Sequence, residues 1–283
     1  MTQYPALSRQ KQNDFADVDQ SLNPQSIVSY LERSRDVNEI QVLKKLSYIL
    51  MEAQVGKCLL DAGCGIGDDV RALAQIVGPR GRVVGIDNSQ KLLDIARKGS
   101  EGLDLPVEFI FGNVSRLDIA DSTFDGCRAE RVLQHCENPE QVLSEMVRVV
   151  RPGGSIVVVD VDYDAVITSL TNHALARKLT QVKCDAVRNG WIGRQLPGLF
   201  RRCGLADIRV FPTVLYFTDF DPEDSYWEFL FTMGQQLDIL SADDIAEIRN
   251  DMHRLSERGE YFDFGVFFSV VGRKLKCSVD LHL

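Results

Sequence analysis

Residues 59–69 read LLDAGCGIGDD, a short apolar run that leads into three alternating glycines. Gly63, Gly65 and Gly67 lack a Cβ, so the backbone can turn tightly there and approach a ligand closely. A helical pattern follows the last glycine. A strand, a glycine turn and a helix in this order are typical of nucleotide-binding α/β proteins. The stretch therefore predicts a dinucleotide or nucleoside cradled by backbone at the carboxyl end of a strand.

Acidic residues near the glycine turn narrow the choice of ligand. Asp87 ends the next predicted strand, residues 83–87, where a short carboxylate can accept hydrogen bonds from both hydroxyls of a ribose. The alternative is that Asp87 only caps the helix that opens at Ser89. Asp68 stands where the NAD-type fingerprint has its third glycine. The sequence therefore favours a nucleoside over a pyrophosphate-bearing dinucleotide.

Four ordered blocks extend this pattern along residues 57–154. After the glycine turn and the strand that ends in Asp87 come FIFGNV at 109–114, FDGCRAERVLQH at 124–135 and VVRPGG at 149–154. In these blocks the chain resembles the class I S-adenosylmethionine-dependent methyltransferases, especially the small-molecule members akin to the ubiquinone/menaquinone C-methyltransferases. The resemblance implies S-adenosylmethionine as cofactor and methyl transfer to an O, N or C nucleophile of a small metabolite.

The same resemblance assigns residues to the methionine end of the cofactor. It implies that the backbone at Gly63, Cys64 and Gly65 meets the methionine part. Asp61 either touches the cofactor or orients the glycine turn through backbone amides. Glu130, at the end of the fourth strand, either accepts from the methionine ammonium group or forms an ion pair with its neighbours.

Three further residues are assigned to the adenine. Asn113 stands where many relatives have an aspartate that accepts from the adenine amino group; an amide oxygen can do the same, or its NH₂ can face a ring nitrogen. Val114 would offer its backbone N–H. Asn88 either flanks the adenine or only shapes a turn. Because an asparagine stands in place of the aspartate, both ways of binding the adenine remain open for Asn113.

Candidate acceptor residues follow the fourth and fifth strands. His135 is either a general base or a packing and capping residue. Asp160, Asp162 and Tyr163, with Asp164, are predicted to form an acidic rim at the acceptor site, which would suit a cationic or hydroxyl-bearing acceptor; the alternative is a solvated loop. No metal set is expected, because alignment of a nucleophile with an activated sulfonium methyl asks little of side chains.

Composition excludes several classes of protein. A net charge of −9 and a pI near 5.0 disfavour a nucleic-acid binder, which needs a basic face. Seven scattered cysteines without a C-x-x-C pair indicate a reducing compartment and no structural zinc. The polar start, residues 1–23, has no apolar targeting region, and no run reaches membrane-spanning length. We therefore expect a cytoplasmic enzyme with a small-molecule acceptor, no membrane or nucleic-acid partner, and an oligomeric state that the sequence leaves open.

Strand and helix patterns alternate from residue 58, which predicts a parallel sheet wound on both faces. With the resemblance, the fold class is α/β: a Rossmann-like, doubly wound, mostly parallel seven-stranded sheet whose last strand is antiparallel. We expect an N-terminal arm and helices over residues 1–52 and a methyltransferase domain over 53–283, with a helical lid inserted at 221–258. A cyclase or isomerase that binds the same cofactor, a non-catalytic nucleotide-binding protein and an NAD-dependent oxidoreductase are the alternatives.

Overall fold

A computed structural model describes residues 18–20, 24–35, 37–218, 220–221 and 225–276. Most of the polar first segment, the expected helix start at Pro222, and Cys277 lie outside these residues. The strands are β1 (Cys58–Ala62), β2 (Arg82–Asp87), β3 (Val107–Phe111), β4 (Phe124–Glu130), β5 (Val150–Thr168), β6 (Leu205–Phe217) and β7 (Asp263–Lys274).

The strands form one seven-stranded sheet in the order β3-β2-β1-β4-β5-β7-β6. The first five are parallel neighbours, and β7 runs antiparallel between β5 and β6. The predicted fold class is confirmed, including the antiparallel last strand. The chain order reverses at β1 and β4, whose carboxyl ends therefore flank the crevice where open α/β sheets bind ligands.

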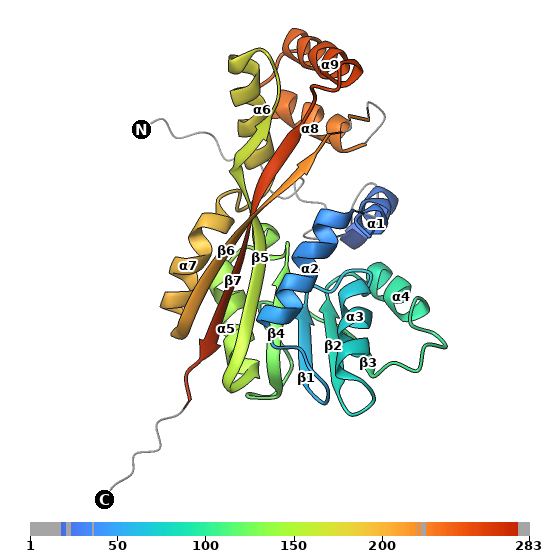
Figure 1. Cartoon of the computed structure of the whole chain (residues 1–283), viewed down its shortest axis with the longest axis vertical. Coiled ribbons are helices and arrows are strands. Elements are labelled where there is room, and N and C mark those ends of the chain that lie inside the picture. The colour runs from blue at the N-terminus through green and yellow to red at the C-terminus, as the bar shows by residue number, and fades with distance from the viewer. Residues whose placement is uncertain (1–17, 21–23, 36, 219, 222–224, 277–283) are drawn as a thin grey trace, which may run out of the picture.

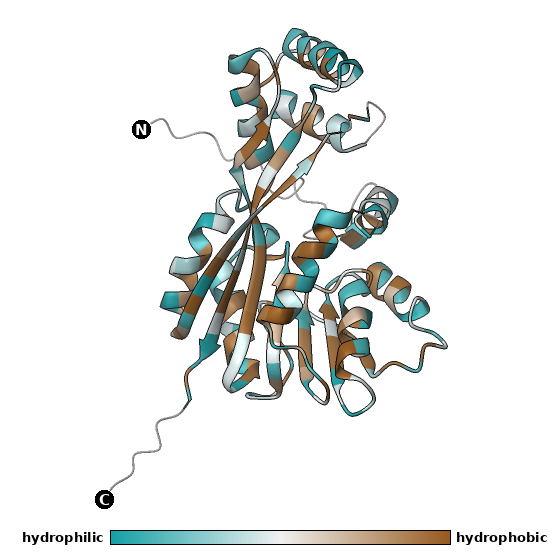
Figure 2. Ribbon diagram, in the orientation of Figure 1, coloured by the Kyte–Doolittle hydropathy of each residue, from teal (hydrophilic) through white to brown (hydrophobic). Residues whose placement is uncertain are grey.

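Helices cover both faces of this sheet (Figure 1). They are α1 (Pro24–Arg33), α2 (Asn38–Leu50), α3 (Asp68–Val77), α4 (Gln90–Lys98), α5 (Pro139–Val149), α6 (His173–Asp185), α7 (Ile192–Arg202), α8 (Ser225–Gln236) and α9 (Ala242–Glu257), with short 3₁₀ turns η2 (Val18–Gln20) and η3 (Leu133–His135). Alternate residues of each central strand belong to different cores: Val158 packs with α5 and α7, and Val157 packs with α2 and α3. Both faces of the central strands are therefore apolar, as Figure 2 shows.

A helical lobe stands on the extended ends of β5, β6 and β7 (Figure 1). It consists of α6, α8 and α9, which share a separate apolar core that includes Leu179, Trp227 and Met252. The expected insertion before the last strand is thus present as α8 and α9, and α6 completes it. Ser241 begins α9 with a reciprocal capping box with Asp244, and the Asn138 side chain caps α5.

The fifth strand, β5, is 19 residues long. It pairs with β7 from Ser155 opposite Arg273 to Thr168 opposite Asp263, so it continues into the helical lobe. Residues 160–164 are therefore part of a strand and do not form a loop. In the part of the chain that the structure describes, no helix combines the length and apolarity needed to span a bilayer.

Candidate functional site

The glycine turn between β1 and α3 is held against the end of β2. Gly63 and Cys64 both donate their backbone N–H to the carbonyl of Ile86, at 2.7 and 2.9 Å. Gly63 and Gly65 have φ of +76° and +53°, the left-handed region that favours glycine. The N–H groups of Gly63 and Cys64 are therefore engaged within the protein and are not open to a ligand.

Asp87 joins the glycine turn to the start of α4. Its Oδ2 accepts the Gly65 N–H at 2.8 Å and its Oδ1 accepts the Ser89 N–H at 3.0 Å. Ser89 is itself the N-cap of α4, so Asp87 is not the capping residue. Burial raises the pKa of Asp87, and the backbone amide bonds oppose that rise. A carboxylate has about four acceptor positions, and the backbone amides of Gly65, Asn88 and Ser89 take three of them, so at least one remains for a hydroxyl donor.

A cavity of about 1110 Å³ opens at the carboxyl ends of β1, β2 and β4. We call it the larger cavity. It takes residues from the sheet edge, from α1, and from α6 and α8 of the helical lobe. Its lining includes nine of the predicted site residues: Gly63, Gly65, Asp87, Asn88, Asn113, Val114, Glu130, His135 and Tyr163. The structure therefore places the predicted ribose and adenine residues around one space, together with His135 and Tyr163 of the predicted acceptor residues.

Asn113 uses its amide oxygen within the protein. Its Oδ1 accepts both the backbone N–H of Ser115, at 2.9 Å, and the hydroxyl of Ser115, at 2.7 Å. The sequence left two ways for Asn113 to bind the adenine, through its amide oxygen or through its NH₂ group. Because the oxygen is already bonded to Ser115, the arrangement favours the NH₂ group facing a ring nitrogen.

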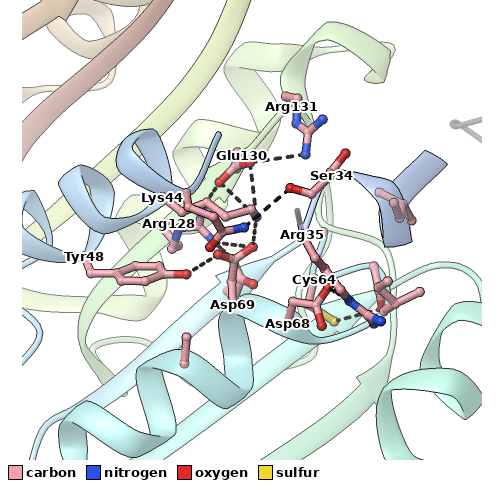
Figure 3. Close-up of a pocket in the computed structure, with 17 residues that line it drawn as sticks. Ser34, Arg35, Lys44, Tyr48, Cys64, Asp68, Asp69, Arg128, Glu130 and Arg131 are labelled. Atoms are coloured by element: carbon pink, nitrogen blue, oxygen red, sulfur yellow. Dashed lines mark hydrogen bonds and ion pairs between the residues drawn. The ribbon is translucent and has the colours of Figure 1, made fainter. Parts of the chain in front are cut away.

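A second, smaller cavity of about 240 Å³ lies beside the glycine turn and under α2. Charged side chains line it and pair with one another (Figure 3). We call six of them the ion cluster: Lys44, Asp61, Asp69, Arg128, Glu130 and Arg131. The Arg128 side chain is only 1% exposed, and its Nη1 lies 3.0 Å from Asp61 and 3.2 Å from Asp69. Three cations therefore balance three carboxylates in a nearly water-free place.

The ion cluster contains Asp61 and Glu130, for each of which the sequence left two roles open. Asp61 contacts Arg128 and lines the smaller cavity, and burial raises its pKa to about 7. Glu130 pairs with Lys44, Arg128 and Arg131, so the structural ion pair is present. Glu130 also lines both cavities, and its Oε1 makes no hydrogen bond among the described residues, although Lys44 Nζ and Arg131 Nη2 each lie 3.3 Å from it. That oxygen is a candidate acceptor for an ammonium group.

The predicted acidic rim is wrong. Asp160 is fully buried in β5, and its Oδ2 accepts the backbone N–H of Leu133 at 3.1 Å. Asp162 is also buried, and Arg194 binds both of its oxygens, with a contact of 2.7 Å at Oδ1. Neither residue lines the larger cavity, whereas Tyr163, which follows Asp162, does. The alternation of a strand sends Tyr163 to the face opposite that of Asp160 and Asp162.

His135 lines the larger cavity at the end of η3. Burial lowers the pKa of its imidazole to about 3, and the charge of Arg131 acts in the same direction. The ring is therefore neutral at physiological pH, and it is a weak proton acceptor. The base role remains a prediction with little support from this environment.

Sequence reasoning missed the contribution of Asp19 and the contact of Tyr30 with the cavity. The Asp19 carboxylate accepts the Ser89 hydroxyl at 2.6 Å and the Gln90 N–H at 2.8 Å, so it stabilises the start of α4 beside Asp87. Tyr30 of α1 and Tyr226 of α8 line the larger cavity. No local spacing connects residues 19 and 89 or 30 and 226, so no sequence pattern indicates these contacts.

Comparison with known proteins places this geometry in a family. Residues 60–158 match the family model described as a methyltransferase domain. A 37.1 kDa protein encoded in a transposon of Streptomyces fradiae is 38% identical over 198 residues, covering 70% of this chain and 57% of that protein. A demethylmenaquinone methyltransferase of Bacillus cereus is 38% identical over 115 residues, covering 40% of this chain and 48% of that protein. The chain thus spans about half the length of these curated relatives.

A solved structure shows the same fold over most of the chain. It is phosphoethanolamine N-methyltransferase 2 of Haemonchus contortus in complex with S-adenosyl-L-methionine, which aligns with a TM-score of 0.60 and 16% identity over 93% of this chain and 60% of that one. The family match, the strand order and the glycine turn agree with one another. Residues 60–158 therefore match a methyltransferase domain, and the chain is similar to the class I methyltransferases, whose cofactor is S-adenosylmethionine, and resembles the quinone C-methyltransferase group among them.

Proposed function

We propose that this protein transfers a methyl group from S-adenosylmethionine to an O, N or C nucleophile of a small, partly apolar molecule. The position of the Asp87 carboxylate is the main support for this proposal. The carboxylate is anchored by Gly65 and Ser89 at the edge of the larger cavity, with at least one acceptor position left for a ribose hydroxyl. The demethylmenaquinone methyltransferases among the relatives support a small-molecule acceptor.

The residues present fit the cofactor along its length. Asp87 would hold the ribose, Asn113 and Val114 would meet the adenine, and Glu130 with the glycine-turn backbone would meet the methionine part. S-adenosylmethionine supplies an already activated methyl group. The chain's part is then to align the acceptor with that methyl and to exclude water. The two acidic residues in the first turn of α3 are unsuited to a pyrophosphate, which argues against NAD.

Transfer of labelled methyl groups tests the proposal. The protein is incubated with methyl-labelled S-adenosylmethionine and a mixture of small metabolites, and the products are separated by mass. We expect S-adenosylhomocysteine and a labelled small molecule in equal amounts. Recovery of intact, bound S-adenosylmethionine would instead support the cyclase, isomerase or non-catalytic alternatives.

We further propose that residues 222–258, with the helical segment 25–52, close as a lid over the acceptor on a methyltransferase domain formed by residues 53–283. In support, Tyr30 and Leu31 of α1 and Phe229 of α8 all line the larger cavity. In contrast, α9 contributes no lining residue and packs in the core of the helical lobe. Closure by α1 and α8 would exclude water from the transfer.

Hydrogen exchange tests the lid. We expect amides of α1 and α8 to exchange more slowly when S-adenosylhomocysteine and an acceptor bind together, because both helices would then contact ligand. Amides of β1 and β4 serve as the control, since these buried strands already exchange slowly. Equal protection of α1 and α8 with and without ligands would leave them as ordinary packing.

A further inference from the structure

Four hydrogen-bond donors from four different elements line the larger cavity. They are Tyr30 of α1, Arg131 at the end of β4, Tyr163 of β5 and Tyr226 of α8, and we call them the donor cluster. Tyr30 and Tyr163 lie within electrostatic range of Arg131, and Tyr226 lies within range of both tyrosines. The three phenols and the guanidinium therefore converge on one region.

Arg131 is fixed in place by its backbone and by its partners. It is a non-glycine residue with φ of +54°, and its backbone N–H donates to the carbonyl of Val159 at 2.7 Å. Its Nη1 donates to the Tyr30 hydroxyl oxygen at 2.9 Å, and its guanidinium carbon lies 5.7 Å from the centre of the Tyr30 ring. Such left-handed positions in non-glycine residues cluster at functional sites. The contact polarises the Tyr30 hydroxyl as a donor.

The hydroxyl of Tyr163, like that of Tyr30, is arranged as a hydrogen-bond donor. Gln134, which is 4% exposed, makes a side-chain hydrogen bond with Tyr163, and its Oε1 has no hydrogen bond among the described residues, so its NH₂ group donates and the phenol oxygen accepts. A phenol has a single proton, and this proton is therefore available to donate. Burial raises the pKa values of Tyr163 and Tyr226 well above the ordinary value, so both phenols stay protonated at physiological pH.

Proton acceptors at this cavity are poor or already engaged. His135 is neutral and weakly basic, with its pKa lowered to about 3. Of the carboxylates in the described lining, Asp87 holds backbone amides, Glu130 is paired in the ion cluster, Glu228 is paired with an arginine, and Glu137 is exposed. The described lining is therefore richer in donors than in groups able to remove a proton.

We propose that the acceptor binds as an anion: an ionised enol, phenol or carboxylic acid whose oxygen accepts from the donor cluster. This inference rests on the proposed methyl transfer. A lone pair of the anion, on oxygen or on the conjugated carbon, forms the new bond to the methyl carbon. The bond from that carbon to sulfur breaks, and its electron pair stays on sulfur. The neutral product needs no base in methylation on oxygen, whereas methylation on a carbon that carries hydrogen releases that proton to water.

Binding of a chromogenic phenol tests the anion preference without methyl transfer. The protein is saturated with S-adenosylhomocysteine, and 4-nitrophenol is titrated with pH while its absorbance is recorded. We expect the apparent pKa of the bound phenol to fall by about one unit, which is about a tenfold preference for the anion. We expect the uncharged 4-nitroanisole to bind more weakly than the phenolate.

Single tyrosine variants assign the effect to the donor cluster. Tyr163→Phe and Tyr226→Phe should each reduce the shift in the pKa of bound 4-nitrophenol. Tyr216→Phe, which removes a hydroxyl from a 56% exposed tyrosine on β6 outside the cavity, should leave it unchanged. An unchanged or raised pKa, or failure of the protein to retain the phenolate, would overturn the anion proposal. Failure to bind S-adenosylhomocysteine would overturn the proposed function itself.

Discussion

Replacing Arg128 by methionine is expected to lower the free energy of unfolding by about 3–5 kcal/mol, the cost of breaking a buried charge network. The Arg128 side chain is 1% exposed and contacts Asp61, Asp69 and Glu130. Its loss leaves three buried carboxylates with fewer cations, and at least one must be protonated or exposed to water. Chemical denaturation of both proteins at pH 7 measures the difference.

A matched control separates burial from the mere loss of an arginine. Arg82 pairs with Glu108 through a side chain that is 51% exposed. Arg82→Met should therefore change the free energy of unfolding by no more than about 1 kcal/mol. Equal effects of the two substitutions would show that the ion cluster does not contribute as described.

The second large effect is expected for Asp87→Ala. Each lost charge-assisted contact to a ribose hydroxyl should weaken binding of S-adenosylhomocysteine by roughly 1.5–3 kcal/mol. Calorimetric titration measures this loss, and circular dichroism checks that the variant is folded. Asp94→Ala, which removes an exposed carboxylate of α4, should bind S-adenosylhomocysteine like the parent.

Because Asp87 also accepts the Gly65 N–H, its loss can loosen the glycine turn as well. A cofactor analogue that lacks both ribose hydroxyls separates the two effects. The parent should bind this analogue more weakly than S-adenosylhomocysteine, whereas Asp87→Ala should bind the two alike. A full loss on removing the hydroxyls in both proteins would assign ribose recognition to other residues.

The sequence predicts the sheet and the nucleotide-facing edge because both depend on local patterns. The alternation of strands and helices from residue 58 leads to the observed strand order, and helix caps at Asn138 and Ser241 are where their residue types indicate. The glycine turn and Asp87 adjoin because the carboxyl ends of neighbouring parallel strands meet at one edge. For the same reason the predicted adenine residues Asn113 and Val114 line the same cavity.

Features that depend on distant partners could not be predicted. A run of acidic residues such as that around Asp160 and Asp162 usually indicates a solvated loop. Here the pairing of β5 with β7 continues to Thr168, and both residues are buried. A lysine in a helix such as α2 is usually exposed to solvent, yet Lys44 contacts Asp69 and Glu130 in the ion cluster. Burial of a charge depends on a partner far away in the sequence, which periodicity does not reveal.

Calorimetry tests whether the larger cavity binds S-adenosylmethionine through its ribose. The protein is titrated separately with S-adenosylmethionine, S-adenosylhomocysteine and NAD under the same conditions. The structure leads us to expect saturable binding of the first two ligands and little or none of NAD, because Asp87 accepts from a ribose diol while acidic residues begin α3. Tight binding of NAD with no response to either adenosyl ligand would contradict this account.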